Sequence, residues 1–215
     1  MSNGQTISSL TLSEVKQQFG VSEVESSDFF PEWRSDLAEV SDLEQSWLDK
    51  LKADFLSLEQ YPLHEELVKM AMLGPLLSLA GFFQYPFYPQ AEAEVFFTAK
   101  DGEAVARGRI DVLVVRSQLW VAVVESKNKR FSLIEAVPQA LSYMMMSPNA
   151  GFPTFGFVTN GTHFAFLKLE RQNSPLYAIS DELSLKRQGN ELYQVLGVLK
   201  SLGQLAVTWE ESLTA

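Results

Sequence analysis

Apolar positions recur every three or four residues in several segments, and this spacing predicts amphipathic helices. The longest such segment covers residues 35–60, where either Ser35 or Ser41 would serve as the N-cap. Its apolar positions are Leu37, Val40, Leu43, Trp47, Leu48, Leu51 and Phe55. Further helices are expected from Leu10 to Phe19, ended by Gly20, and over 63–80, 132–146 and 190–205.

Prolines modify two of these helices. Pro62 suits the first turn of the 63–80 helix, and Gly81 suits its C-terminal cap. Pro75 should kink or break that helix, because proline lacks an N–H and crowds the preceding turn. For the same reason Pro138 should delay the regular part of the 132–146 helix until about Val137.

Shorter apolar runs bounded by turn residues predict strands at 93–98, 107–116, 118–125, 155–159 and 162–167. Asn160-Gly161 predicts a two-residue hairpin turn between the last two. The order is helices, three strands, a helix, two strands and a helix. We therefore expect an α/β domain with a mixed sheet flanked by helices.

The composition sets limits on organisation and class. The 215 residues fit one domain, 60–215, preceded by an acidic helical extension, 1–59. The chain has no cysteine, which excludes disulfides, thiolate metal sites and a cysteine nucleophile, and fits a cytoplasmic protein. No apolar run approaches the ~20 residues that span a bilayer, so no membrane partner is expected.

Charge is distributed unevenly along the chain. The net charge is -10. Residues 1–66 hold 14 acids and 4 bases, whereas residues 100–130 hold 7 bases and 4 acids. The overall charge argues against nonspecific binding of nucleic acid by the whole chain. The local positive charge surrounds the residues that carry candidate chemistry.

Those residues are Glu125-Ser126-Lys127, which follow the apolar run 119–124, and Asp111 on the preceding predicted strand. Alternate residues of a strand share a face, so Glu125 and Lys127 should point the same way. Two carboxylates and a lysine on one sheet face can hold a hard cation beside a phosphate. The alternative is that Asp111 only pairs with Lys127 or Arg109.

Two further patterns need their context. Glu14-Val15-Lys16 has the same acid-x-lysine spacing, but on a predicted helix, where a solvated pair is expected. Gln139 and Tyr143 are four residues apart and should share one side of the helix after the acid-x-lysine strand. Gln84 and Tyr88 repeat that spacing in a proline-rich loop.

A carboxylate, a strand and then acid-x-lysine resembles the PD-(D/E)xK nuclease superfamily. The Gln-x-x-x-Tyr pair is similar to exonuclease domains of recombination helicase–nucleases. Residues 64–82 and the hairpin 157–166 resemble the N-terminal nuclease domain of type I restriction enzyme motor (R) subunits. The resemblance covers about 60–170 in the same order, and implies a restriction-endonuclease-like three-layer core.

The resemblance also implies roles. Asp111 and Glu125 would bind Mg²⁺, with Mn²⁺ as an alternative, and the Ser126 carbonyl would add a ligand. Glu65 would complete the acidic cluster from the 63–80 helix. Lys127 would orient or deprotonate the attacking water and stabilise developing negative charge.

Other residues would position the substrate. Gln139 and Tyr143 would orient DNA or the catalytic lysine, and Lys129 and Arg130 would contact DNA. The family pattern selects Glu65, although a helical wheel puts Glu66 on the apolar side, among Leu63, Met70 and Leu73, and Glu65 nearer Lys69. His64 would either approach the metal or serve as a polar residue at the helix start.

Three functions follow from these patterns. The first is a Mg²⁺-dependent endodeoxyribonuclease acting on DNA. The second, favoured by the acidity, is a catalytically weak or inactive nuclease-fold module that binds a protein or nucleic-acid partner. The third is an α/β protein whose carboxylates only form ion pairs.

The chain lacks a Gly-x-x-x-x-Gly-Lys-Ser/Thr loop for ATP. The aromatic residues that would form a homodimer patch, or else belong to the core, are Trp33, Trp47, Phe82 and Phe83.

Overall fold

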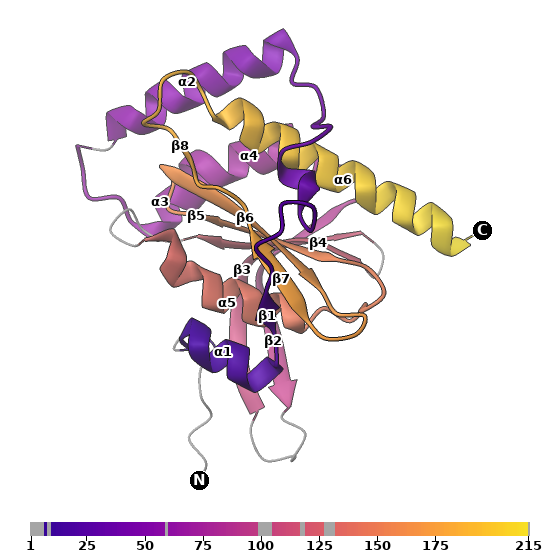
Figure 1. The fold of residues 1–215 in the computed structure, drawn as a ribbon. Helices are drawn as coiled ribbons and strands as arrows, with labels where there is room; N and C mark the ends of the chain where they lie inside the picture. Colours follow the sequence, from indigo (N-terminus) through magenta and orange to yellow (C-terminus); the bar gives the residue numbers. More distant parts are fainter. Residues whose placement is uncertain are drawn as a thin grey trace.

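The computed structural model describes residues 7, 10–58, 60–98, 105–116, 119–126 and 132–214. Of residues 121–126 it describes the main chain. The described residues form an α/β fold with one mixed sheet of eight strands and helices against it, as the order of elements predicted (Figure 1). Among the helices in these ranges, none is long and apolar enough to cross a membrane.

The strands lie in the order β1-β7-β6-β5-β4-β3-β2, and β8 pairs with β6. The pairs β4–β5 and β1–β7 are parallel, and the other pairs are antiparallel. Their bounds are β1 Ser22–Glu23, β2 Tyr88–Thr98, β3 Val105–Arg116, β4 Leu119–Ser126, β5 Thr154–Thr159, β6 His163–Glu170, β7 Leu176–Ile179 and β8 Leu183–Ser184.

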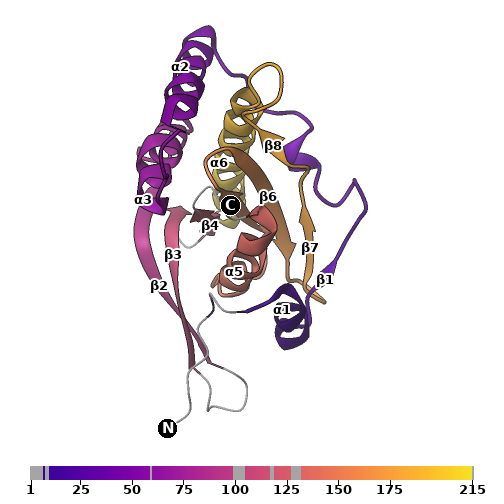
Figure 2. The same cartoon turned by 90° about the vertical axis from the view of Figure 1, so that its left-hand side faces the viewer.

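Helices cover both faces of the sheet (Figures 1 and 2). One face packs against α2, α4 and α6, and the other against α1 and α5. Strand β6 shows the alternation, since Phe164 and Phe166 join the first core and Ala165 and Leu167 the second. The helices are α1 Leu12–Phe19, α2 Asp42–Leu58, α3 Glu65–Val68, α4 Gly74–Leu79, α5 Leu133–Met145 and α6 Leu192–Thr214, with short η2 at Pro31–Trp33.

Local chemistry explains where the first helices begin and end. Gly20, with φ 63°, ends α1 as predicted. Of the two serines considered as caps, Ser41 starts α2: its main-chain N–H and hydroxyl donate to Glu44, and the Glu44 N–H donates back to the hydroxyl at 3.4 Å. The helix therefore begins at Asp42, later than the predicted residue 35.

The predicted 63–80 helix is divided by a π-helical turn, η3, at Lys69–Leu73. In this turn the Gly74 N–H donates to the Lys69 carbonyl, directly before Pro75. A proline in a regular helix crowds the carbonyl four residues earlier, here that of Ala71. The irregularity expected at Pro75 therefore takes the form of this wider π turn. Gly81, with φ 82°, follows the helix as predicted.

Three expectations about these elements were wrong. Helix α5 begins at Leu133 instead of Val137, because buried side chains on both sides of Pro138 pack against the sheet. The β5–β6 register pairs Thr159 with Phe164, so the hairpin loop exceeds two residues. In that loop the Asn160 side chain accepts from the main chain two and three residues on, at 3.1 and 2.9 Å. Helix α6 extends to Thr214, beyond the predicted 205.

The N-terminal residues pack into the same two cores as the rest of the chain. Leu48 and Phe55 of α2 lie in one core with Phe157, and Val15 of α1 lies in the other. The division into residues 1–59 and 60–215 stays a prediction.

Candidate functional site

The site lies where β3 continues beyond its ladder with β4. The β3–β4 ladder begins at Val112, whereas the β2–β3 ladder continues to the pair Thr98 and Val105. The β2–β3 pair therefore projects from the body of the sheet (Figures 1 and 2). Asp111 occupies the position on β3 just before the ladder with β4 begins.

Asp111 is a buried carboxylate, with 8% of the residue exposed. Its Oδ1 lies 2.7 Å from Nζ of Lys69, the first residue of the π turn. Burying an ionised carboxylate is unfavourable unless a partner compensates its charge. The Lys69 ammonium supplies part of that compensation from the helices that cover this part of β3.

Lys69 joins two further carboxylates to Asp111. Its Nζ lies 3.1 Å from Oε1 of Glu65, one helical turn earlier, and 3.3 Å from Oε1 of Glu92 on β2. Burial by itself lowers the pKa of Lys69, but the hydrogen bonds and charges of Asp111 and Glu65 outweigh it and raise that pKa. The ammonium is therefore charged at neutral pH, and one cation already lies among three acids.

Glu92 has an unusual main chain for a strand residue. Its φ is 54°, in the left-handed region that residues other than glycine seldom adopt. The neighbouring register pairs, Ala91 with Val112 and Ala93 with Ile110, place Glu92 opposite Asp111. Its carboxylate also pairs with Nη1 of Arg109 at 3.2 Å. The strained residue thus links the acid cluster to the next basic side chain on β3.

The two helix glutamates have different surroundings. Glu65 faces Lys69 and Asp111, whereas Glu66 is exposed. The helical wheel was wrong in placing Glu66 on the apolar side, since Met70 of the same predicted side is 70% exposed. The π turn shifts the residues after Val68 around the axis relative to a regular helix. His64 is the exposed N-cap residue of α3.

Gln139 and Tyr143 share one side of α5, as predicted, and their side chains contact each other. Gln139 Nε2 donates to the Tyr143 hydroxyl at 3.0 Å, and the main-chain N–H of Arg109 donates to the same oxygen at 3.1 Å. The Tyr143 ring lies against Gly108, where a Cβ would overlap it. These contacts fasten α5 to β3 close to Asp111.

The acid-x-lysine segment is described in part. The main chain of Glu125 and Ser126 belongs to β4 and pairs in parallel with Val158 and Thr159 of β5. The antiparallel β3–β4 register pairs Val112 with Val124, so its extension by one position would set the main chains of Asp111 and Glu125 opposite each other. Lys127, Lys129 and Arg130 lie outside the described residues.

The other acid-x-lysine pattern has a different setting. Glu14 lies on α1, where it caps the helix start through Thr11. Lys16 pairs with Glu23 of β1 at 2.9 Å, not with Glu14.

The donors around Lys69 suit a hard cation. Mg²⁺ prefers carboxylate oxygens, and Glu65 and Asp111 both reach one positively charged atom. Within the described ranges, no group of three or more histidine, aspartate or glutamate side chains could hold a metal ion. A complete metal site therefore needs a further ligand, and Glu125 is the predicted residue for that position.

No protein-family model matches this sequence, and no curated protein matches it. Solved structures do include similar chains. One is a fragment assigned to the HsdR subunit of a type I restriction enzyme from Vibrio vulnificus, with 20% identity and a TM-score of 0.40. The likeness is distant. It covers 64% of this chain and 26% of that one, so this chain spans about a quarter of the other's length.

Sequence reasoning missed two residues of the cluster. The helical wheel placed Lys69 near Glu65 without giving it a role, and Glu92 was not singled out. The four-residue spacing of Glu65 and Lys69 was the signal for the first, and no sequence signal marks the second.

Proposed function

We propose that this chain is a Mg²⁺-dependent endodeoxyribonuclease with a restriction-endonuclease-like three-layer core. The observation that carries the proposal is the β3–β4 register, which pairs Val112 with Val124 and which, extended by one position, would set Asp111 opposite Glu125. Residues directly opposite in an antiparallel pair present their side chains to one face. A buried carboxylate at Asp111 and a second acid opposite it would form the core of a metal site.

Residues of the chain would have separate roles in the proposed reaction. Asp111, Glu125 and the Ser126 carbonyl would hold the ion, and Glu65 would complete the acidic cluster from α3. When bound, Mg²⁺ or Mn²⁺ would polarise a phosphodiester and acidify a water molecule. Lys127, two residues beyond Glu125 in the sequence, would orient that water and stabilise negative charge.

Residues around this core would position the strand and the substrate. Gln139 and Tyr143 hold the β3 main chain at Arg109, which supports the proposal that they keep the site in place. Lys129 and Arg130 would contact DNA phosphates and offset the acidity of the chain. We expect the protein to act in the cytoplasm, where DNA is available.

A plasmid-nicking assay tests this function. Wild type, Asp111→Asn and the control Asp54→Asn would be incubated with supercoiled DNA and Mg²⁺. Asp54 is an exposed helix carboxylate paired with Lys50, so its variant controls for the loss of one acid. Nicking by Asp111→Asn should fall at least about a hundredfold, the scale expected for loss of a transition-state stabiliser. Equal nicking by all three proteins would place the activity elsewhere.

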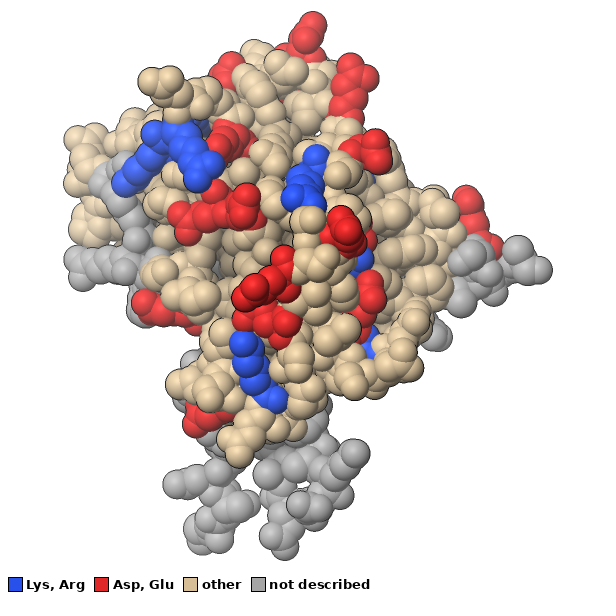
Figure 3. Space-filling model, in the orientation of Figure 1, with Lys and Arg blue, Asp and Glu red and all other residues tan. Residues whose placement is uncertain are grey.

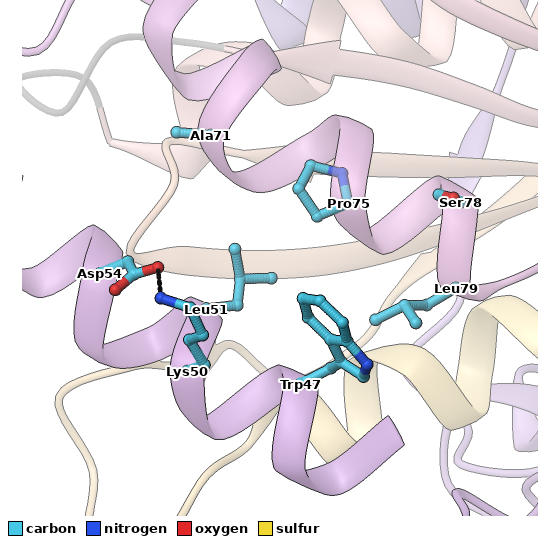
Figure 4. A pocket seen from close by; sticks show the side chains of 8 residues that line it. All are labelled: Trp47, Lys50, Leu51, Asp54, Ala71, Pro75, Ser78 and Leu79. Atoms are coloured by element: carbon cyan, nitrogen blue, oxygen red, sulfur yellow. Dashed lines mark hydrogen bonds and ion pairs between the residues drawn. The ribbon is translucent and has the colours of Figure 1, made fainter. Parts of the chain in front are cut away.

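The second candidate function is a partner-binding module, and a groove between α2 and α4 favours it. Its cavity is about 510 Å³, and Trp47, which is 57% exposed, forms one wall (Figure 4). The other lining residues are Lys50, Leu51, Asp54, Ala71, Pro75, Ser78 and Leu79. Between Lys69 and Glu92 the sequence carries no charged residue. Exposed Met70 and Phe83 lie in that uncharged segment.

The expected aromatic patch is only partly present. Trp47 and Phe83 are exposed, whereas Phe82 is buried and Trp33 packs against the core. Acidic side chains are spread over the face drawn in Figure 3, where basic ones form a few small groups.

The partner of the groove between α2 and α4 would be a second copy of the chain. A concentration-dependent mass in sedimentation, lost in Trp47→Ala, would support the module, and a monomer at every concentration would contradict it.

A further inference from the structure

The Lys69 ammonium already lies between Asp111 and Glu65, the two carboxylates of the proposed site whose side chains the structure describes. Lys69 Nζ lies 2.7 Å from Asp111 and 3.1 Å from Glu65, which are hydrogen-bonding distances. A Mg²⁺ ion held by the same oxygens would need bonds of about 2.1 Å, in the same space. Two positive charges at that separation repel each other. The ammonium and the metal ion therefore compete for these acids.

A second acceptor for the ammonium lies beside the first. Glu92 is 3.3 Å from the same Nζ, and its side chain is 50% exposed, against 10% for Asp111. The flexible stem of a lysine lets its charge move between neighbouring acids. The φ of 54° at Glu92 costs free energy that the surrounding structure must offset. Holding a carboxylate at this point is a reason for such strain to persist.

We propose that Lys69 holds the cation position between Glu65 and Asp111 until a divalent metal ion displaces it, and that Glu92 receives the displaced ammonium group. Lys69 and Glu92 are then positioning residues that set the affinity for the metal. This inference rests on the proposed function, because it takes Asp111 as a metal ligand. It makes predictions of opposite sign for the two residues.

The test is calorimetric titration of Mn²⁺ into the full chain at neutral pH, without DNA. Lys69→Met removes the competitor and should bind Mn²⁺ about tenfold more tightly than wild type, the scale of one charge-assisted contact. Glu92→Gln removes the acceptor and should bind more weakly. In a Lys69→Met background, Glu92→Gln should have no further effect, because Glu92 acts through Lys69.

Matched controls exist in the chain. Arg187→Met removes the cation of a surface pair that also spans four residues, and Glu94→Gln removes an exposed acid on β2. Both should leave the affinity unchanged. Circular dichroism checks that each variant is folded, and if Lys69→Met is not, Glu92→Gln decides alone: affinity equal to wild type overturns the proposal.

The outcomes separate this inference from the proposed function. If Asp111→Asn loses Mn²⁺ binding but Lys69→Met binds no more tightly than wild type, the metal site stands and the role of Lys69 is wrong. If no variant and no wild-type protein binds Mn²⁺, both proposals are wrong.

Discussion

Replacing Tyr143 by phenylalanine would test how the fold holds the site strand. The substitution removes only the hydroxyl and leaves the ring against Gly108. That oxygen accepts from the Arg109 main chain at 3.1 Å and from Gln139 at 3.0 Å. The residue is 1% exposed, so water cannot readily replace the lost acceptor.

The expected loss follows from these two contacts. A buried donor left without an acceptor costs about 1–3 kcal/mol, and a typical intramolecular hydrogen bond contributes about 1 kcal/mol net. We therefore expect Tyr143→Phe to lower the free energy of unfolding by about 2 kcal/mol. Tyr193→Phe is the matched control, because the Tyr193 hydroxyl donates to Asp49 at the surface over 2.7 Å. Its loss should cost no more than about 0.5 kcal/mol.

Urea unfolding followed by circular dichroism measures both values by linear extrapolation. A change in the midpoint urea concentration, with no change in the slope of unfolding free energy against urea concentration, would report a change in stability alone. If Tyr143→Phe lay within about 0.5 kcal/mol of wild type, the hydroxyl would not be the acceptor that fastens β3 to α5.

Two further predictions concern the turn and the acid stability. Gly161→Ala should destabilise the fold by about 2 kcal/mol or more, because its φ is 85° and a Cβ would overlap Phe55. The control is Gly189→Ala, where φ is 80° and the space around the Cβ is open, and it should lower the free energy of unfolding in urea by only about 1 kcal/mol. Equal losses of unfolding free energy in the two variants would show that the contact with Phe55 does not matter. Hydrogen bonds from Lys16 and Tyr177 hold the pKa of Glu23 below its ordinary 4.5. The free energy that Glu23 contributes to folding is therefore present above pH 4.5 and is lost as the pH falls through its lowered pKa. The difference in unfolding free energy between wild type and Glu23→Gln should shrink as the pH falls through that pKa. A difference that is independent of pH would refute this assignment.

Much of the fold could be predicted because its signals are local. Three-to-four spacing identifies α2 and α6, and Gly20 and Gly81 mark helix ends through their positive φ. Strands β1, β7 and β8 were missed. Two of them have two residues each, too few to show alternation. Their pairing joins Ser22 to Leu176, far along the chain, and no local pattern reports such a contact.

The candidate site divides in the same way. Asp111, Glu65, Gln139 and Tyr143 could be selected from spacing and resemblance, and the structure brings Glu65 to Asp111 and Tyr143 to the β3 main chain. The position of Lys69 depends on a π turn. Glu92 depends on a left-handed φ at a residue that is not glycine. Neither conformation has a signature in the residues that adopt it, so the cluster around Lys69 required the structure.

The most direct test of the metal site is an anomalous difference map from a crystal soaked in Mn²⁺. We expect a peak about 2.1 Å from an Asp111 carboxylate oxygen and within the same distance of Glu125. We also expect Lys69 Nζ to move away from Asp111 toward Glu92. A map with no peak at Asp111, and with Lys69 still paired to it, would contradict the proposed metal site.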